Sequence, residues 1–295
     1  MKTVCKTVGL FFLLFPSLLM ADESLSVFVS VIPQKYFVEK IGGDQVKVSV
    51  MVEPGAGPAV YEPKPVQMTE LSKARIYFSI GVPFENTWLQ RFKAANPDMR
   101  IIPTQEGIEK IAMAAHHHEE EKEGAYAHAH EGIKDPHIWL SPPLVMIQAR
   151  NILTGLLGID PENSDIYEKN YKSFIREIAE LDTEILGILG REKKRSEFMV
   201  FHPAWGYFAR AYGLKQFPAE VEGKEPKPAE LQKLIQWGKK EKIRAVFVQP
   251  QYSAKSARVL ASAIGGQVIA ADPLAPDWPE NLRQTAVKFR NALQQ

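Results

Sequence analysis

The sequence is almost without cysteine: Cys5 is the only one among 295 residues. A chain with no cysteine pair cannot depend on disulfides, so it must bury a hydrophobic core large enough to stabilise itself. About 270 residues remain beyond the N-terminal segment described below, which is enough for such a core and predicts two lobes.

Other absences exclude whole classes of function. The sequence contains no H-E-x-x-H, no G-x-S-x-G and no phosphate-binding glycine loop, so the common hydrolase and nucleotide-binding signatures are missing. The formal net charge of +1 gives no basic footprint for nucleic acid. After the N-terminal segment no apolar run is long enough to span a bilayer. These absences favour a binding protein over an enzyme.

The N-terminal segment has the order of a secretory signal. Lys2 and Lys6 precede the apolar run Val8–Leu19, and Ala21 is a small residue suited to cleavage. We therefore expect residues 1–21 to be removed, which takes the net charge from +1 to −1. Cys5 precedes the apolar run, so it is not placed for lipid attachment at the cleavage point.

The chain that follows alternates strands with helices, which predicts an α/β fold. Expected strands are Leu25–Ile32, Val46–Val52, Arg75–Ile80, Met99–Pro103, Phe198–Phe201, Arg244–Val248 and Gln267–Ala271. Expected helices are Pro33–Ile41, Pro65–Ala74, Phe84–Ala95, Pro142–Leu157, Pro203–Tyr212, Pro228–Lys240, Ser256–Ile264 and Trp278–Leu293. We assign residues 22–158 to an N-terminal lobe and residues 191–295 to a C-terminal lobe.

A long periodic segment, residues 159–190, separates the two lobes. Asp160-Pro161 predicts an N-cap followed by proline at the first helical position. Apolar residues then recur at spacings of three and four, as on one face of a helix. They are Tyr167, Tyr171, Phe174, Ile178, Leu181, Ile185 and Leu189. A helix of about 28 residues spans roughly 40 Å, long enough to join two lobes.

Six of the seven histidines lie between positions 116 and 137. Residues 112–134 carry five histidines and five glutamates with almost nothing to pack a core, which predicts a mobile insertion in the N-terminal lobe. Imidazole and carboxylate are ligands for zinc and similar metals, so this insertion is a candidate for accessory metal capture. Its histidines are His116, His117, His118, His128 and His130. The alternative is a solvated polar loop.

Three further side chains are candidates for a rigid metal site. His202 and Asp272 each follow a predicted buried strand, and His137 follows a proline and precedes an apolar segment. Taken singly, each histidine is explained by ordinary core packing, and Asp272 by an Asx-turn. Together they predict ligands that converge in a cleft between the lobes.

Four segments resemble the metal-binding substrate-binding proteins of ABC transporters (cluster A-I, or cluster 9), particularly the zinc type. They are Gly57-Pro58-Ala59-Val60-Tyr61-Glu62-Pro63, Asp135-Pro136-His137-Ile138-Trp139-Leu140-Ser141-Pro142, Phe201-His202-Pro203-Ala204-Trp205-Gly206-Tyr207-Phe208 and Asp272-Pro273-Leu274. The resemblance implies two Rossmann-like lobes joined by a single long rigid helix, with metal bound in the cleft by His137, His202 and Asp272. It also implies a periplasmic monomer that serves a membrane permease and its ATPase. Histidine at position 202, where manganese-type members have glutamate, favours zinc over manganese.

One position departs from the family pattern. The family has a histidine ligand directly after the proline of the first segment, and here that residue is Ala59. Alanine cannot ligate, and zinc prefers four ligands. We expect water or a bidentate Asp272 to complete the shell, rather than a loop histidine, because ordering a long polar loop costs entropy.

We therefore expect an exported protein that captures a divalent metal for an ABC importer, and the resemblance favours zinc as that metal. Three alternatives remain at this point. They are a metal buffer without a transporter, a descendant that has lost its metal and acts as an adhesin or binds another ligand, and a zinc hydrolase with Glu62 as its base.

Deleting residues 115–131 tests the insertion. The melting temperature of the metal-free protein should stay nearly unchanged, because the segment offers little apolar surface to bury. Calorimetry of the deletion variant beside the full chain measures this. A large drop in melting temperature would mean that the segment packs against the lobes.

Overall fold

The computed structural model describes residues 24–114, 134–190, 196–220, 224–252 and 254–294. The predicted signal segment and the five histidines of the insertion lie outside these ranges. Among the described residues, none of the helices combines the length and apolarity that a membrane crossing requires.

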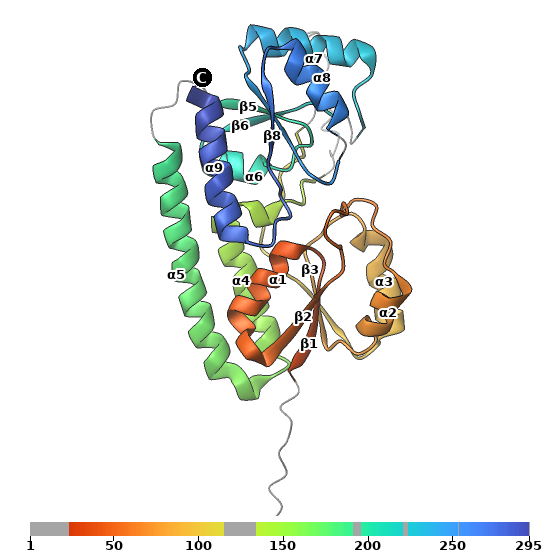
Figure 1. The fold of residues 1–295 in the computed structure, drawn as a ribbon. Helices are drawn as coiled ribbons and strands as arrows, with labels where there is room; N and C mark the ends of the chain where they lie inside the picture. The colour runs from red at the N-terminus through yellow and green to blue at the C-terminus, as the bar shows by residue number, and fades with distance from the viewer. Residues whose placement is uncertain (1–23, 115–133, 191–195, 221–223, 253, 295) are drawn as a thin grey trace, which may run out of the picture.

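The first lobe is a parallel sheet of four strands in the order β2-β1-β3-β4. The strands are β1 (Leu25–Val29), β2 (Val46–Val50), β3 (Ile76–Ser79) and β4 (Arg100–Pro103). The central strand β3 is buried along its whole length, as expected for a parallel strand covered on both faces. Helices α1 (Ile32–Gly42) and α4 (Pro142–Leu157) lie on one side of the sheet, and α2 (Pro65–Leu71) and α3 (Glu85–Ala95) on the other (Figure 1).

The second lobe repeats this architecture with the order β6-β5-β7-β8. Its strands are β5 (Glu197–Val200), β6 (Lys215–Pro218), β7 (Ala245–Val248) and β8 (Gln267–Ala270). Its helices are α6 (Gly206–Ala211), α7 (Pro228–Lys240), α8 (Lys255–Ala263) and α9 (Trp278–Gln294). Strand β6 was not predicted: the short sequence Lys-Gln-Phe-Pro does not alternate, and only a sheet edge tolerates its proline.

The long helix α5 (Ser164–Leu189) joins the lobes and confirms the predicted two-lobed α/β fold. It begins later than predicted, because residues Pro161–Asn163 form a separate 3-10 turn. Asp160 does not cap the helix through its side chain; its carboxylate instead accepts hydrogen bonds from Asn163 and Tyr167. The predicted apolar face is the buried one, except that Tyr171 is only partly buried. The lobe limits at 158 and 191 stay predictions.

A second helix, α9, also contacts both lobes and runs beside α5 (Figure 1). At its start the Trp278 ring meets Phe37 of α1, with ring centres 5.0 Å apart. Near its end Phe289 lies among four aromatic rings of the second lobe. These rings are Phe198, Trp205, Phe208 and Phe247, at 4.2, 5.4, 5.6 and 4.6 Å between centres. Helix α9 therefore packs against the first lobe as well as the second.

The two ends of the histidine-rich insertion meet. Ala112 and Lys134 form an antiparallel bridge, and Asp135 N donates to the Ile111 carbonyl at 2.9 Å. Ile111 N in turn donates to the Tyr207 hydroxyl of the second lobe at 3.1 Å. The two ends of this segment therefore lie together beside the second lobe, and the insertion itself stays a prediction.

Phe289→Ala should lower the free energy of unfolding by about 3–5 kcal/mol, because it leaves a cavity among packed aromatic rings. Denaturant unfolding of the metal-free protein measures the loss. Gln284→Ala, on the exposed face of the same helix, should stay within about 0.5 kcal/mol of the parent. A loss below about 1 kcal/mol at Phe289 would contradict the packing described.

Candidate metal site

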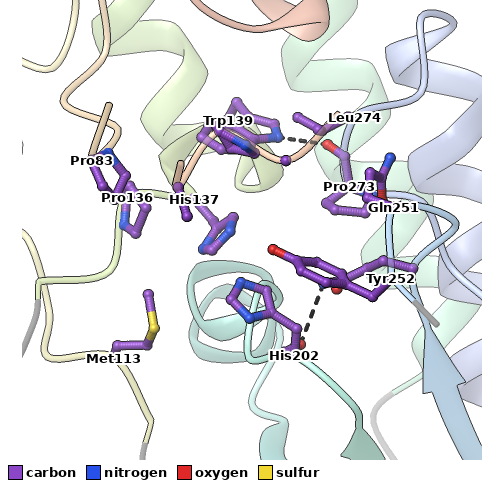
Figure 2. A pocket seen from close by; sticks show the side chains of 14 residues that line it. Pro83, Met113, Pro136, His137, Trp139, His202, Gln251, Tyr252, Pro273 and Leu274 are labelled. Atoms are coloured by element: carbon purple, nitrogen blue, oxygen red, sulfur yellow. Dashed lines mark hydrogen bonds between the residues drawn. The ribbon is translucent and has the colours of Figure 1, made fainter. Parts of the chain in front are cut away.

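A small pocket lies between the lobes, at the carboxyl ends of their parallel strands, where α/β sheets bind ligands. Residues that precede α5 in the sequence and residues that follow it line this pocket. They are Gly57, Pro58, Ala59, Pro83, Met113, Pro136, His137 and Trp139 before α5, and His202, Gln249, Gln251, Tyr252, Pro273 and Leu274 after it (Figure 2).

The size of the pocket limits its ligand. Its volume is about 50 Å³, whereas pockets for organic ligands run to roughly 300–1,000 Å³. A water molecule needs about 10–15 Å³ on this measure. The pocket therefore suits an ion with a few waters rather than an organic solute.

His137 is held by the segment that carries it. Asp135 Oδ1 accepts a hydrogen bond from His137 N at 2.9 Å and lies 2.7 Å from His137 Nδ1. Both side chains are buried. A carboxylate on Nδ1 fixes the ring and its tautomer and leaves Nε2 as the free, electron-rich nitrogen, as in carboxylate–histidine–metal arrangements.

His202 is held in the same way by the adjacent strand. The parallel register pairs Val200 of β5 with Pro218 of β6. His202 and Glu220 each lie two residues beyond those partners, so the register brings them side by side. His202 Nδ1 lies 2.6 Å from Glu220 Oε1, and Glu220 is buried. The Nε2 atom of His202 is again the free one.

The two imidazoles face each other across the cleft. Their ring centres are 5.3 Å apart with planes at 73°, and Figure 2 shows both rings directed into the pocket. An ion bound to both Nε2 atoms at 2.0–2.1 Å with a tetrahedral angle would place the ring centres about 5 Å apart. The observed separation therefore matches that of two histidine ligands of one tetrahedral metal.

Asp272 is not gathered with the two histidines. Its Oδ1 accepts hydrogen bonds from Gln251 Nε2 at 2.8 Å and from Leu274 N at 2.9 Å, and the second bond is the Asx-turn that the sequence also allowed. Its neighbours Pro273 and Leu274 line the pocket, but Asp272 does not. In the described parts of the chain no three His, Cys, Asp or Glu side chains form a metal cluster. The role of Asp272 as a metal ligand stays a prediction.

Two unpartnered oxygens make the pocket suitable for a cation. Gln249 Nε2 donates to the His202 carbonyl at 3.4 Å, and Gln251 Nε2 donates to Asp272. With the amide nitrogens so placed, the buried Oε1 atoms of both glutamines have no partner among the described residues. A buried acceptor without a partner costs free energy, which a hydrated cation would recover.

Burial lowers the pKa of His137 below the ordinary 6.5, and the neighbouring Asp135 carboxylate opposes the shift without cancelling it. The ring is therefore neutral at physiological pH. Neutral imidazole is the form that binds metal.

The other candidates are placed as follows. Ala59 lines the pocket, as expected if a histidine there would reach the metal. Glu62 is exposed and lies outside the pocket lining, so it is not placed as a base. Sequence reasoning missed Asp135 and Glu220 as partners of the histidines. For Asp135 the signal was its position two residues before His137, whereas Glu220 could be found only from the register of an unpredicted strand.

The sequence profile of one family, described as the zinc-uptake complex component A, periplasmic, matches residues 27–292. The chain is 29% identical over 249 residues to the high-affinity zinc uptake system protein ZnuA of Bacillus subtilis, covering 83% of this chain and 77% of that protein. A crystal structure of ZnuA is 43% identical, with a TM-score of 0.84 over 92% of this chain and 99% of that one. A zinc-bound deletion mutant of ZnuA matches equally well.

More distant structures share the fold alone. The laminin-binding protein of Streptococcus agalactiae, whose structure is described as that of a bifunctional adhesin and metal transporter, is 22% identical with a TM-score of 0.78. That likeness extends to the arrangement of lobes and helices and carries no argument about adhesion by this chain.

The free energy of unfolding of the metal-free protein should depend on pH through His137. Its lowered folded-state pKa means that this contribution is present above pH 6.5 and is lost as pH falls through the folded pKa. In this pH range His137 of the unfolded chain binds a proton, whereas the buried ring of the folded protein stays neutral. His137→Gln keeps a donor for Asp135 but does not titrate, so its stability should fall less over the same range. Denaturant unfolding at several pH values compares the two; identical profiles would contradict the prediction.

Proposed function

Because this chain belongs to the family of periplasmic zinc-uptake components, we propose that it captures zinc between its lobes and delivers it to a membrane permease. The family is one of substrate-binding proteins, which confirms the prediction of a binder rather than an enzyme. Zinc is its cargo rather than a resident cofactor.

One observation supports the assignment to this pocket: two imidazole side chains, each with Nδ1 against a buried carboxylate, face each other with ring centres 5.3 Å apart. Each imidazole has a carboxylate at its Nδ1 atom, and these two negative charges favour binding of a divalent cation. Histidine nitrogen is a ligand that zinc accepts readily, whereas magnesium and calcium prefer oxygen. Manganese is a weaker candidate, since it also favours carboxylate and water.

We assign His137 and His202 as ligands and Asp272 as a third. For Asp272 to bind the metal, its carboxylate must enter the pocket although Gln251 Nε2 and Leu274 N both donate hydrogen bonds to Oδ1. The five loop histidines would serve as accessory capture groups that raise the local zinc concentration without forming the rigid site.

The transport role needs a membrane permease with its ATPase. After removal of the signal segment, the protein would reach this permease as a monomer in the periplasm. A metal buffer without a transporter would use the same pocket. A neighbouring permease gene and loss of zinc uptake on deletion of this chain separate the two roles.

The ligand assignment is tested by zinc affinity of the purified mature protein, measured by competition with a chelator. His137→Ala and His202→Ala should each weaken zinc binding at least tenfold, since each removes a ligand. Glu220→Gln should weaken it by about 10–100-fold, because the imidazole loses the carboxylate that orients it.

Glu197→Gln is the matched control. This glutamate lies at the start of β5 and pairs with Lys215 at the surface, 2.9 Å away. Its neutralisation should leave zinc affinity unchanged. Parental affinity in both alanine variants would show that the zinc site lies elsewhere.

A further inference from the structure

Tyr252 projects into the pocket from the turn that follows β7. Its ring centre lies 5.3 Å from that of His202, with planes tilted by 32°. Figure 2 shows its hydroxyl end directed at the space between His137 and His202. This oxygen is therefore aimed at the place where a metal shared by the two histidines would bind.

The same hydroxyl lies on the side of the pocket formed by the Gly57–Ala59 segment. A Cβ atom built on Gly57 would be 3.5 Å from the Tyr252 hydroxyl oxygen, and Ala59 lines the same pocket. The tyrosine thus approaches from the second lobe the region that a histidine at position 59 would enter from the first. The hydroxyl makes no hydrogen bond with a described residue.

We propose that the Tyr252 oxygen is a direct metal ligand, taking the coordination position that Ala59 leaves open. This inference rests on the proposed function. On binding, a zinc–oxygen bond forms at the 2.0–2.2 Å typical of oxygen donors, and the phenol proton passes to solvent. The ring is already in the pocket, so this ligand avoids the ordering cost that a loop histidine would bring.

The alternative role for Tyr252 is to pack its ring against His202 without binding the metal. A residue that only stacks on His202 needs its ring and not its hydroxyl. Tyr252→Phe keeps the ring and removes the oxygen, so it separates ligation from packing.

The test uses mature wild-type protein, Tyr252→Phe and the control Tyr61→Phe. The Tyr61 hydroxyl bonds Gln67 at 2.8 Å and does not line the pocket. Zinc affinity should fall at least tenfold in Tyr252→Phe and stay unchanged in Tyr61→Phe. Zinc addition should give the near-ultraviolet difference absorption of ionised tyrosine in wild type and in Tyr61→Phe, but not in Tyr252→Phe. Melting curves confirm that each variant is folded.

A second arm uses Ala59→His. Added to Tyr252→Phe it should restore most of the lost affinity, because histidine then supplies the same coordination position; added to wild type it should give a smaller gain. Wild-type affinity in Tyr252→Phe with the difference absorption intact overturns the inference and leaves the proposed function standing. Weaker binding without any tyrosine signal in wild type overturns direct ligation. Failure of wild type to bind zinc overturns both.

Discussion

Two indole hydrogen bonds hold the cleft together. Trp139 Nε1 donates to the Pro273 carbonyl at 2.6 Å, and Trp278 Nε1 donates to the Trp139 carbonyl at 2.7 Å. All three residues are buried, where an indole N–H without an acceptor would cost about 1–3 kcal/mol. Trp139 follows His137 by two residues and Pro273 follows Asp272, so these bonds fix the distance between segments that bear candidate ligands from both sides of α5.

The helices extend this constraint to the whole molecule. Helix α9 packs on the first lobe through Trp278 and on the second through Phe289, so a wide rotation of one lobe would have to break the aromatic packing at one end of α9. Such a frame favours a pocket whose imidazoles are already placed before the ion arrives. Little free energy is then spent on ordering ligands when it binds.

The sequence predicted those features that depend on local pattern. Helix α4 was predicted to the residue because prolines mark its start and its apolar face is regular. His137 and His202 were proposed as ligands from their proline and strand-end positions, and the structure places both in one pocket. The features it missed depend on pairing in space. Glu220 meets His202 only through the register of an edge strand, and Tyr252 meets His202 only once the turn after β7 folds over the pocket. The motif containing Asp272 was recognised, but the hydrogen bonds that occupy its carboxylate were not predictable.

The position of α9 has a consequence for the order of folding. The first lobe carries Phe37 and Tyr36 on α1, and both rings pack against Trp278. Because α9 follows every strand of both sheets in the sequence, the ribosome makes it after all of them. During synthesis the N-terminal lobe therefore lacks this part of its core until α9 has emerged, although its own four strands are made long before.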